Sequence, residues 1–357
     1  MPTVQEFGER WTNNDLARQY RQWVKVIDHT ENARRMRVHV YPVVFKGRTI
    51  GETPMDEFTL DHAEAVLSQH TLKDGSVRHV AQCLHRIFKL AVARARILPQ
   101  SPFPPGWLPP ANEPKDGEFL WPEEEARLLA CAEVPLVWRV AYGVDAREGI
   151  RLGNLRTLRR EHLHLSQPGG RGVIIVPKMK SGRRGHWKLG DDTAEALRRW
   201  LQRHESPWVF PAELLPRYRR TRDGQPVETK HAAERLRAHL TKAGVTRKSL
   251  FEAADNTMRL RCHDLRATFV TLALARGRTR TWIKRRTGHS SDAMIDRYDH
   301  AAGTLRELEM GWLHPLHEAI PELAKMAPSA EWLERQSSLK VRQTVPEGSD
   351  DEEDEDE

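Results

Sequence analysis

The sequence predicts a mainly α-helical protein with two domains and one small β-hairpin or sheet. Three observations support this fold class. Apolar residues recur at three- and four-residue steps over much of the chain, which is the helical period. Residues 172–189 instead show a β-branched run and a polar–apolar alternation around a Ser-Gly turn signal. The 357 residues are enough for about two domains, and seven of the 22 prolines gather in residues 99–114.

The part of the chain before the proline-rich run is predicted to be helical. Apolar residues at helical spacing predict one helix over residues 11–29 and a second over residues 60–69. Ser76 is predicted to be the N-cap of a third helix, whose far side is basic. That basic side could follow a phosphate backbone, although a solvated charged face is the more common outcome.

The second half of the chain is predicted to start after a linker. Residues 99–114 cannot continue a helix or join the interior of a sheet, so we interpret them as an interdomain linker. Pro122 then stands where the first turn of a helix tolerates proline. After the hairpin, Asp192 and Glu195 have the spacing of a capping box ahead of another helix. The remainder is predicted to be largely helical.

The charge distribution favours nucleic acid as the partner. The chain has 57 Lys and Arg against 50 Asp and Glu, a formal net charge of +7. Nine acidic residues and no basic residue lie in residues 346–357, so the rest of the chain carries +16. Arginine supplies 43 of the basic residues, and its planar guanidinium group matches phosphate oxygens. A GC-rich genome also enriches a protein in arginine. Composition alone therefore does not establish nucleic-acid binding, and the sequence motifs must be considered.

The sequence disfavours disulfide-rich, zinc-cluster and membrane proteins. Cys83, Cys131 and Cys262 lie far apart without paired spacing, which fits a reducing compartment. The first residues lack the apolar core of a signal peptide, and no apolar stretch approaches the length of a membrane span. We therefore expect a cytoplasmic, nucleoid-associated protein with no membrane partner and a disordered acidic tail.

The stretch from residue 259 to residue 300 carries most of the chemical information. His263 and Arg266 are three residues apart, so on a helix they project from one face and can bind one phosphate together. The pair alone is weak evidence, because this spacing arises by chance in a chain with so many arginines. Downstream, His289 is followed by Ser290 or Ser291 as a predicted N-cap, and the short helix after it is predicted to carry Tyr298.

Two further cations precede this stretch. Arg151 lies at a predicted junction, where one helix ends at Gly149 and the next begins, so that its guanidinium group can turn inward. Lys180 lies beside the hairpin turn and would add an ammonium group from a mobile strand pair. Lys178 shares its strand face and remains the alternative.

The segment HDLRATFVTLALARG…TGHSSDAMIDRY resembles the tyrosine recombinase, or phage integrase, family. That family uses Arg, Lys, His-x-x-Arg, His or Trp, and Tyr, in this order. The counterparts in this chain are Arg151, Lys180, His263, Arg266, His289 and Tyr298. One departure is Asn154, which stands where the family commonly has an acidic residue shortly after the first arginine.

The resemblance implies a two-domain clamp around double-stranded DNA. A helical core-binding domain would cover residues 1–105 and a catalytic domain residues 115–315, followed by a helical extension over 316–345 and the acidic tail. Tyr298 would attack a DNA phosphodiester, form a 3′-phosphotyrosyl bond and release a 5′-hydroxyl end. Neither ATP nor a metal cofactor would be required. Strand exchange would need a homotetrameric synapse, and accessory DNA-bending proteins are further candidate partners.

The leading functional hypothesis is therefore a site-specific DNA recombinase or integrase of a phage or mobile element. Two alternatives remain: a type IB topoisomerase-like DNA relaxase, and a catalytically silent DNA-binding accessory protein. Phosphate contacts carry no base information, so the sequence leaves the DNA site open, together with the directionality and the choice between integrase and resolvase.

Overall fold

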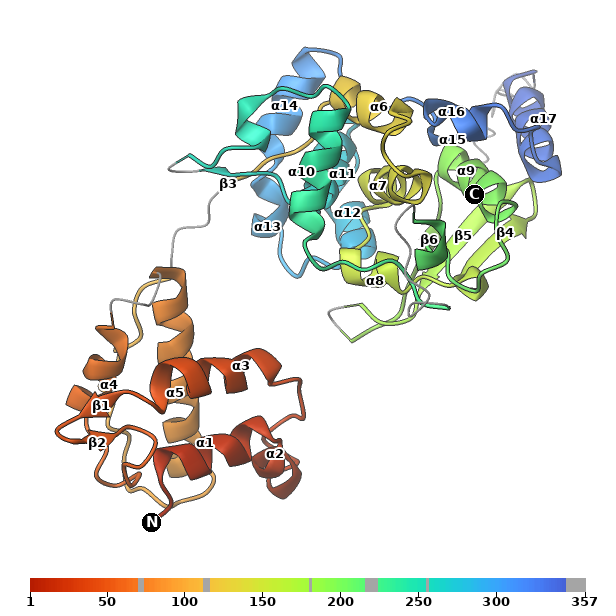
Figure 1. Cartoon of the computed structure of the whole chain (residues 1–357). Helices are drawn as coiled ribbons and strands as arrows, with labels where there is room; N and C mark the ends of the chain where they lie inside the picture. The colour runs from red at the N-terminus through yellow and green to blue at the C-terminus, as the bar shows by residue number, and fades with distance from the viewer. Residues whose placement is uncertain (70–73, 112–115, 180–181, 216–223, 255–256, 345–357) are drawn as a thin grey trace, which may run out of the picture. The chain divides into compact units, whose positions relative to one another are not determined.

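A computed structural model of the chain confirms the predicted mainly helical fold with small sheets. It describes residues 1–69, 74–111, 116–179, 182–215, 224–254 and 257–344. The chain divides into two compact units, Met1–Pro114 and Lys115–Glu357 (Figure 1). Within the described ranges, none of the helices combines the length and the hydropathy that a membrane span requires.

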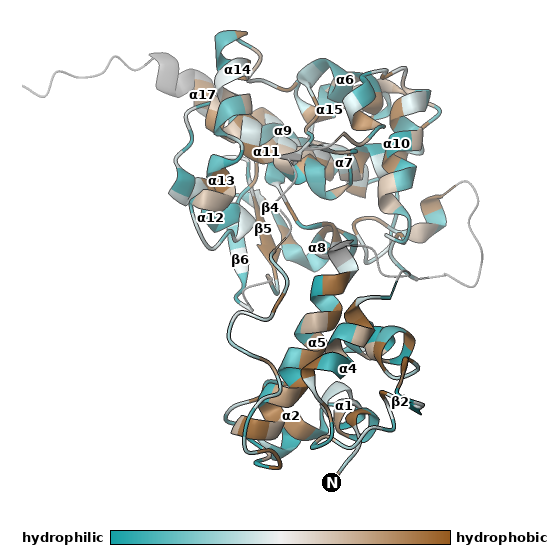
Figure 2. Cartoon of the chain, turned by 90° about the vertical axis from the view of Figure 1, so that its left-hand side faces the viewer, coloured by the Kyte–Doolittle hydropathy of each residue, from teal (hydrophilic) through white to brown (hydrophobic). Residues whose placement is uncertain are grey.

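The first unit combines short helices, one long helix and a small hairpin. Its helices are α1 (Val4–Thr12), α2 (Asp15–Gln19), α3 (Thr30–Arg35), a π-helix (Met36–Val40), α4 (Leu60–Leu67) and α5 (Asp74–Ala93). The strands β1 (Val44–Phe45) and β2 (Arg48–Thr49) pair antiparallel. Helix α5 has hydrophobic and hydrophilic sides (Figure 2), and its buried residues join Phe7 and Leu16 in one core. The amphipathic long helix thus organises this unit.

The helix predicted over residues 11–29 is wrong, because the chain turns at Asn14. This residue has a left-handed backbone, with φ of 66°. Its side-chain Nδ2 donates to the Ile27 carbonyl at 2.9 Å, and its Oδ1 accepts from the Ile27 N–H at 3.1 Å. Asparagine tolerates the left-handed region because its side chain can bond locally. The long helix is therefore replaced by α1, α2 and an irregular segment.

The other two helix predictions in this unit are confirmed. Helix α4 occupies most of the stretch predicted over residues 60–69. Helix α5 begins at Asp74, so Ser76 lies inside the first turn and is not the N-cap that the sequence predicted.

The second unit is larger and surrounds two central helices, α7 and α11, that pack against each other. Both are buried along most of their length. The helices are α6 (Pro122–Ala130), α7 (Leu136–Glu148), α8 (Leu152–Arg156), α9 (Asp191–Leu201), α10 (Ala232–Lys242), α11 (His263–Ala275), α12 (Arg280–Thr287), α13 (Ala293–Asp296), α14 (Asp299–Glu307), α15 (Leu316–Ala319), α16 (Pro321–Ala324) and α17 (Ala330–Thr344). Pro122 opens α6, as predicted.

Three antiparallel strands form the main sheet of this unit, in the order β4-β5-β6. The predicted hairpin is confirmed by β5 (Arg171–Val176) and β6 (Gly185–Lys188), whose register runs from Val173 opposite Lys188 to Val176 opposite Gly185. The sequence did not predict β4 (Leu163–Gln167), which pairs with the other edge of β5. A separate parallel pair joins β3 (Asp116–Gly117) to β7 (Thr257–Met258).

The capping box predicted from Asp192 and Glu195 is wrong. Helix α9 begins at Asp191 with Gly190 as its N-cap. The Asp192 carboxylate instead accepts from Arg147 Nε at 3.2 Å, and that of Glu195 accepts from Arg199 Nε at 2.7 Å. Asp192 is the second residue of α9 and so cannot be its N-cap, and both carboxylates bind arginines.

Replacing Asn14 by alanine is expected to destabilise the first unit. The change removes both hydrogen bonds to Ile27 and places a β-carbon without local bonding in a left-handed conformation, at a cost of about 1 kcal/mol or more. Urea unfolding of the full chain would measure this loss. Asn13→Ala is the matched control, because Asn13 is exposed and has negative φ at the end of α1. Equal stability of the two variants would contradict this account of the turn.

Candidate active site

Arg151 is placed by an abrupt reversal of the chain after α7. Gly149 ends that helix with φ of 61°, and a β-carbon at this position would lie 2.4 Å from the ring of Phe269. Only glycine combines this φ with such a close approach. Two residues later Arg151 stands at the N-terminus of α8, as predicted, and its Nη1 is buried without a hydrogen-bond partner among the described residues.

Arg266 connects the ends of two other segments. It lies in the first turn of α11 and is only 2% exposed. Its Nη1 donates to the Gly149 carbonyl at 2.8 Å, and its Nη2 donates to the Thr287 carbonyl. Burial and the nearby charge of Arg151 lower its pKa to about 10, so Arg266 stays charged at neutral pH. Carbonyl groups hold this cation in place without neutralising it.

The two histidines approach Arg266 from different elements. His263 is the first residue of α11 and is partly exposed, and desolvation together with the charge of Arg266 lowers its pKa. His289 follows Gly288, which ends α12 with φ of 65°. Burial and the charges of Arg266 and Arg151 lower the pKa of His289 to about 4. Both imidazoles are therefore neutral at pH 7.

A threonine determines which tautomer His289 adopts. The Thr287 hydroxyl donates to the Ile283 carbonyl at 2.7 Å, and it lies 3.1 Å from His289 Nδ1. Since a hydroxyl has a single proton, we assign the proton of this second bond to Nδ1. His289 Nε2 is then an acceptor in the neutral ring.

Tyr298 lies between α13 and α14, at the N-cap of the latter. The sequence placed it on the short helix and predicted a serine N-cap. Both predictions are wrong, because α13 ends at Asp296 and its N-cap is Asp292. The half-buried ring packs against a cluster that includes Phe269 and Ile295. Burial raises the pKa of the phenol, while the charge of Arg266 opposes that rise, so the hydroxyl is protonated at neutral pH.

The predicted lysine cannot be placed in the same way. Lys180 lies outside the described residues, and Lys178 is exposed beyond the end of β5. The residue between them is buried, with 8% of Met179 exposed. A β-carbon added to Gly288 would come within 2.9 Å of the Met179 methyl group. The described end of the hairpin therefore lies beside the segment that carries His289.

Two of these residues, Arg151 and Arg266, line one small cleft. Asn154 lines it with them, and Met179 and Trp187 complete the side formed by the hairpin. His263, His289 and Tyr298 all lie within the electrostatic reach of Arg266. The described part of the chain gives neither guanidinium group a hydrogen-bonded carboxylate. Two uncompensated cations, two neutral imidazoles and a phenol form a site suited to an anion such as a phosphodiester.

Two buried carboxylates near this site are absent from the sequence-based prediction. Asp145 and Glu148 are each 1% exposed, and both lie on α7. Burial raises the pKa of Asp145 well above its usual value, while the charge of Arg266 opposes this shift. The sequence does contain a signal that these two residues are buried. At helical steps, Asp145 and Glu148 continue the apolar stripe of Val137, Ala141 and Val144. A charged residue on such a stripe indicates a buried polar contact.

Comparison with known proteins gives a consistent picture. The sequence profile described as the phage integrase family matches residues 118–304, slightly more than half of the chain. No curated protein matches the chain significantly.

Solved structures of similar fold include two DNA complexes. The Tn1549 transposon integrase, in complex with transposon right end DNA, aligns with a TM-score of 0.58 and 19% identity over 83% of this chain and 98% of that chain. A lambda integrase dimer bound to a COC′ core site aligns with a TM-score of 0.59 and 14% identity over 83% and 77% of the two chains. At these identities the likeness concerns the fold.

Acidification is expected to destabilise the second unit through His289. In the unfolded chain this ring takes up a proton near pH 6.5, whereas the folded site resists protonation until about pH 4. The unfolded state therefore binds more protons in this window, and the free energy of unfolding falls as the pH is lowered through it. Urea unfolding between pH 7 and pH 4.5 should show a shallower decline for His289→Asn than for the wild type.

The control is His164→Asn, which replaces an exposed histidine on β4 and should keep the wild-type pH dependence. If His289→Asn retained the wild-type slope as well, the buried environment assigned to His289 would be incorrect.

Proposed function

The chain belongs to the phage integrase family and is a tyrosine-type site-specific DNA recombinase, and we propose that it acts through a 3′-phosphotyrosyl intermediate formed by Tyr298. The observation that carries this proposal is the pair of guanidinium groups of Arg151 and Arg266 in one cleft, with His263, His289 and Tyr298 near enough to interact electrostatically with Arg266. A scissile phosphate is the ligand that this arrangement fits best.

In the proposed reaction the Tyr298 oxygen forms a bond to phosphorus as the bond from phosphorus to the 5′ oxygen breaks. Arg151 and Arg266 stabilise the negative charge that develops on the nonbridging oxygens. Arg266 needs no rearrangement to do so, because two backbone carbonyl groups already hold its side chain in place. No ATP is required, because the energy of the broken ester is kept in the new one.

In the proposed reaction the two histidines act in proton transfer and hydrogen-bond donation. His263 accepts the phenol proton as Tyr298 attacks. A bound phosphate offsets the charge of Arg151 and Arg266, and this raises the pKa of His289 and favours its protonated form as a donor to a nonbridging oxygen. Lys180 protonates the leaving 5′ oxygen. In this proposal the arginines and histidines stabilise the developing charge, and no metal cofactor takes part.

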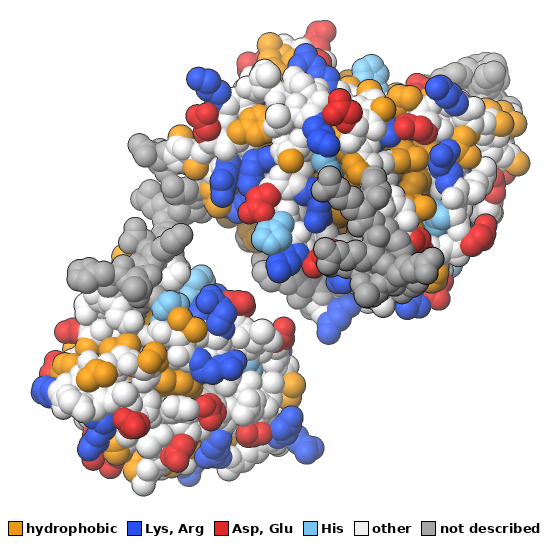
Figure 3. Space-filling view, viewed as in Figure 1, with side chains coloured by type: hydrophobic (Ala, Val, Ile, Leu, Met, Phe, Trp, Pro, Cys, Tyr) orange, Lys and Arg blue, Asp and Glu red, His pale blue; other side chains and the backbone are white. Residues whose placement is uncertain are grey.

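We propose double-stranded DNA as the substrate and partner. Lys and Arg side chains are numerous on the visible surface of each unit (Figure 3), as a phosphate-binding protein requires. The first unit would be the core-binding domain, up to about residue 105, and residues 115–315 the catalytic domain. A homotetramer would exchange both strands, and DNA-bending proteins would assist assembly. The Tn1549 and lambda integrases cited above were solved on DNA, which supports this assignment.

Tyr298→Phe is expected to abolish covalent attachment to DNA while leaving noncovalent binding close to the wild-type level. The substitution removes the attacking oxygen and little else. Nicked suicide duplexes made from the DNA that flanks the gene would be incubated with each protein and examined for SDS-resistant adducts.

Tyr142→Phe is the matched control, because it removes a buried hydroxyl that bonds His239 at 3.0 Å in the core of the same unit. It should still form adducts. A Tyr298→Phe protein that forms adducts would refute the nucleophile. A wild-type protein that binds DNA without forming adducts would support the accessory-protein alternative.

Arg266→Ala should slow cleavage by about 10²- to 10³-fold, the usual effect of removing one donor that stabilises an oxyanion. Arg160→Ala is the control, because Arg160 also donates to backbone carbonyls, those of Ser206 and Leu201 at 2.8 Å, in another part of the unit. Both variants should lose stability, but only Arg266→Ala should lose the chemical step in single-turnover assays. Equal cleavage rates for the two would contradict the role of Arg266.

A further inference from the structure

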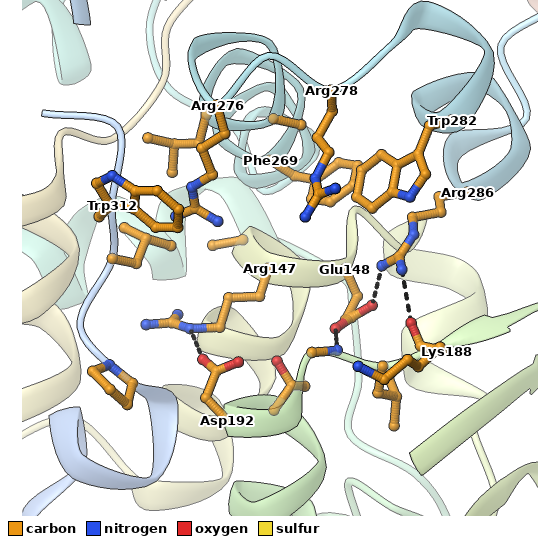
Figure 4. A pocket seen from close by; sticks show the side chains of 18 residues that line it. Arg147, Glu148, Lys188, Asp192, Phe269, Arg276, Arg278, Trp282, Arg286 and Trp312 are labelled. Carbon is orange, nitrogen blue, oxygen red and sulfur yellow. Dashed lines mark hydrogen bonds and ion pairs between the residues drawn. The ribbon is translucent and has the colours of Figure 1, made fainter. Parts of the chain in front are cut away.

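Glu148 is a buried carboxylate that accepts three hydrogen bonds. It is the last residue of α7 and is 1% exposed. Its Oε1 accepts from the Gly190 N–H at 2.9 Å, and its Oε2 accepts from Trp187 Nε1 at 2.8 Å and from Arg286 Nη1 at 3.0 Å. Figure 4 shows Glu148 between Arg286 and the chain near Lys188. A buried carboxylate is stable only with such a full set of donors.

These bonds attach the hairpin strand β6 to the end of α7. Trp187 belongs to β6, and Gly190 follows that strand two residues after its end. Arg286 adds a third link, because its Nη2 donates to the Lys188 carbonyl at 2.7 Å. All three links therefore join the returning strand of the hairpin to Glu148 or to its ion-pair partner.

Arg286 is itself held by aromatic contacts. Its guanidinium carbon lies 4.1 Å from the centre of the Trp282 ring. That ring stacks on Phe269, with centroids 5.9 Å apart. Phe269 in turn packs directly against Gly149, the residue after Glu148. The links thus form a closed circuit from Glu148 through α12 and α11 back to the end of α7.

These links join segments that lie next to the proposed catalytic residues in the sequence, so they can affect the geometry of the active site. Glu148 comes three residues before Arg151, and Lys180 stands in the sequence between the end of β5 and the start of β6. Any shift of β6 against α7 would move Trp187, and with it the hairpin, relative to the arginine cleft. Trp187 lines that cleft, so the attachment reaches the site itself.

We propose that Glu148 is a positioning residue that fixes the β5–β6 hairpin against the arginine cleft, and that the proton donation assigned above to the hairpin lysine depends on this attachment. Glu148 does not touch DNA in this role and acts through Trp187, Gly190 and Arg286. The inference rests on the function proposed above. It predicts a defect in the proton transfer that accompanies rupture of the bond from phosphorus to the 5′ oxygen.

Replacing the scissile 5′ oxygen of the DNA by sulfur distinguishes a defect in proton donation from a general loss of activity. In a duplex whose scissile 5′ oxygen is replaced by sulfur, the leaving group departs as a thiolate and needs no proton. The wild-type protein is first used to map the scissile position, and single-turnover cleavage of oxygen and sulfur duplexes is then compared. Lys180→Ala sets the reference, because losing the general acid should slow the oxygen duplex far more than the sulfur duplex.

Glu148→Gln should slow cleavage of the oxygen duplex by about 10²-fold, the order expected from a misplacement of about 1 Å. Cleavage of the sulfur duplex should stay within about threefold of wild type, since proton donation contributes little there. Trp187→Phe removes the indole donor and part of the ring but leaves the bonds of Glu148 to Gly190 and Arg286, so it should show a weaker defect with the same rescue. This second variant tests the proposal even where Glu148→Gln folds poorly.

Glu195→Gln is the matched control. Glu195 is also buried, pairs with Arg199 at 2.7 Å and accepts from the Ser329 N–H at 3.0 Å, but it joins α9 to the segment before α17. This variant should cleave both duplexes like the wild type. Wild-type cleavage of the oxygen duplex by Glu148→Gln, or an equal loss on both duplexes, would overturn the proposal. Absence of wild-type adducts would instead overturn the function on which it rests.

Discussion

The second unit depends on keeping the charged Arg266 fixed inside the protein. A buried guanidinium group is costly unless every N–H finds a partner, and a carboxylate is the usual solution. Here the carbonyl groups of Gly149 and Thr287 accept from Nη1 and Nη2, while Nε has no hydrogen-bond partner among the described residues. Neutral acceptors hold the side chain without cancelling its charge. The same bonds tie the ends of α7 and α12 to the start of α11. The hydrogen bonds that shape the cleft therefore also position its positive charge.

The low polarity around Arg266 also sets the protonation of its neighbours. Two cations in a desolvated cleft lower the pKa of His263 and His289, and burial raises that of the Tyr298 phenol. The two imidazoles and the phenol are therefore uncharged at neutral pH, whereas Arg266 is charged. A phosphodiester changes this state, because its charge opposes that of the arginines. Substrate binding and proton transfer are thus coupled through the electrostatics of the cleft.

The mainly helical fold and the order of the candidate site residues could be predicted from the sequence, because helical periodicity and residue order are visible without knowledge of the fold. The errors arise where a side chain finds a distant partner. Asn14 bonds Ile27, and Asp192 bonds Arg147 instead of capping α9. Neither partner is visible in local spacing. The buried role of Glu148 depends likewise on Trp187 and Arg286, which are 39 and 138 residues away.

Asn154 illustrates how acidic groups can be redistributed without loss of the site. The acidic residue that the family commonly has at this position is absent, and Arg151 Nη1 has no partner in the described residues. Two carboxylates from α7 stand nearby instead. Asp145 acts on Arg266 through space, and Glu148 binds the hairpin strand and Arg286. Neither carboxylate accepts a hydrogen bond from Arg151 or Arg266. A neutral Asn154 adds no negative charge that would compete with phosphate oxygens for the guanidinium donors of the cleft.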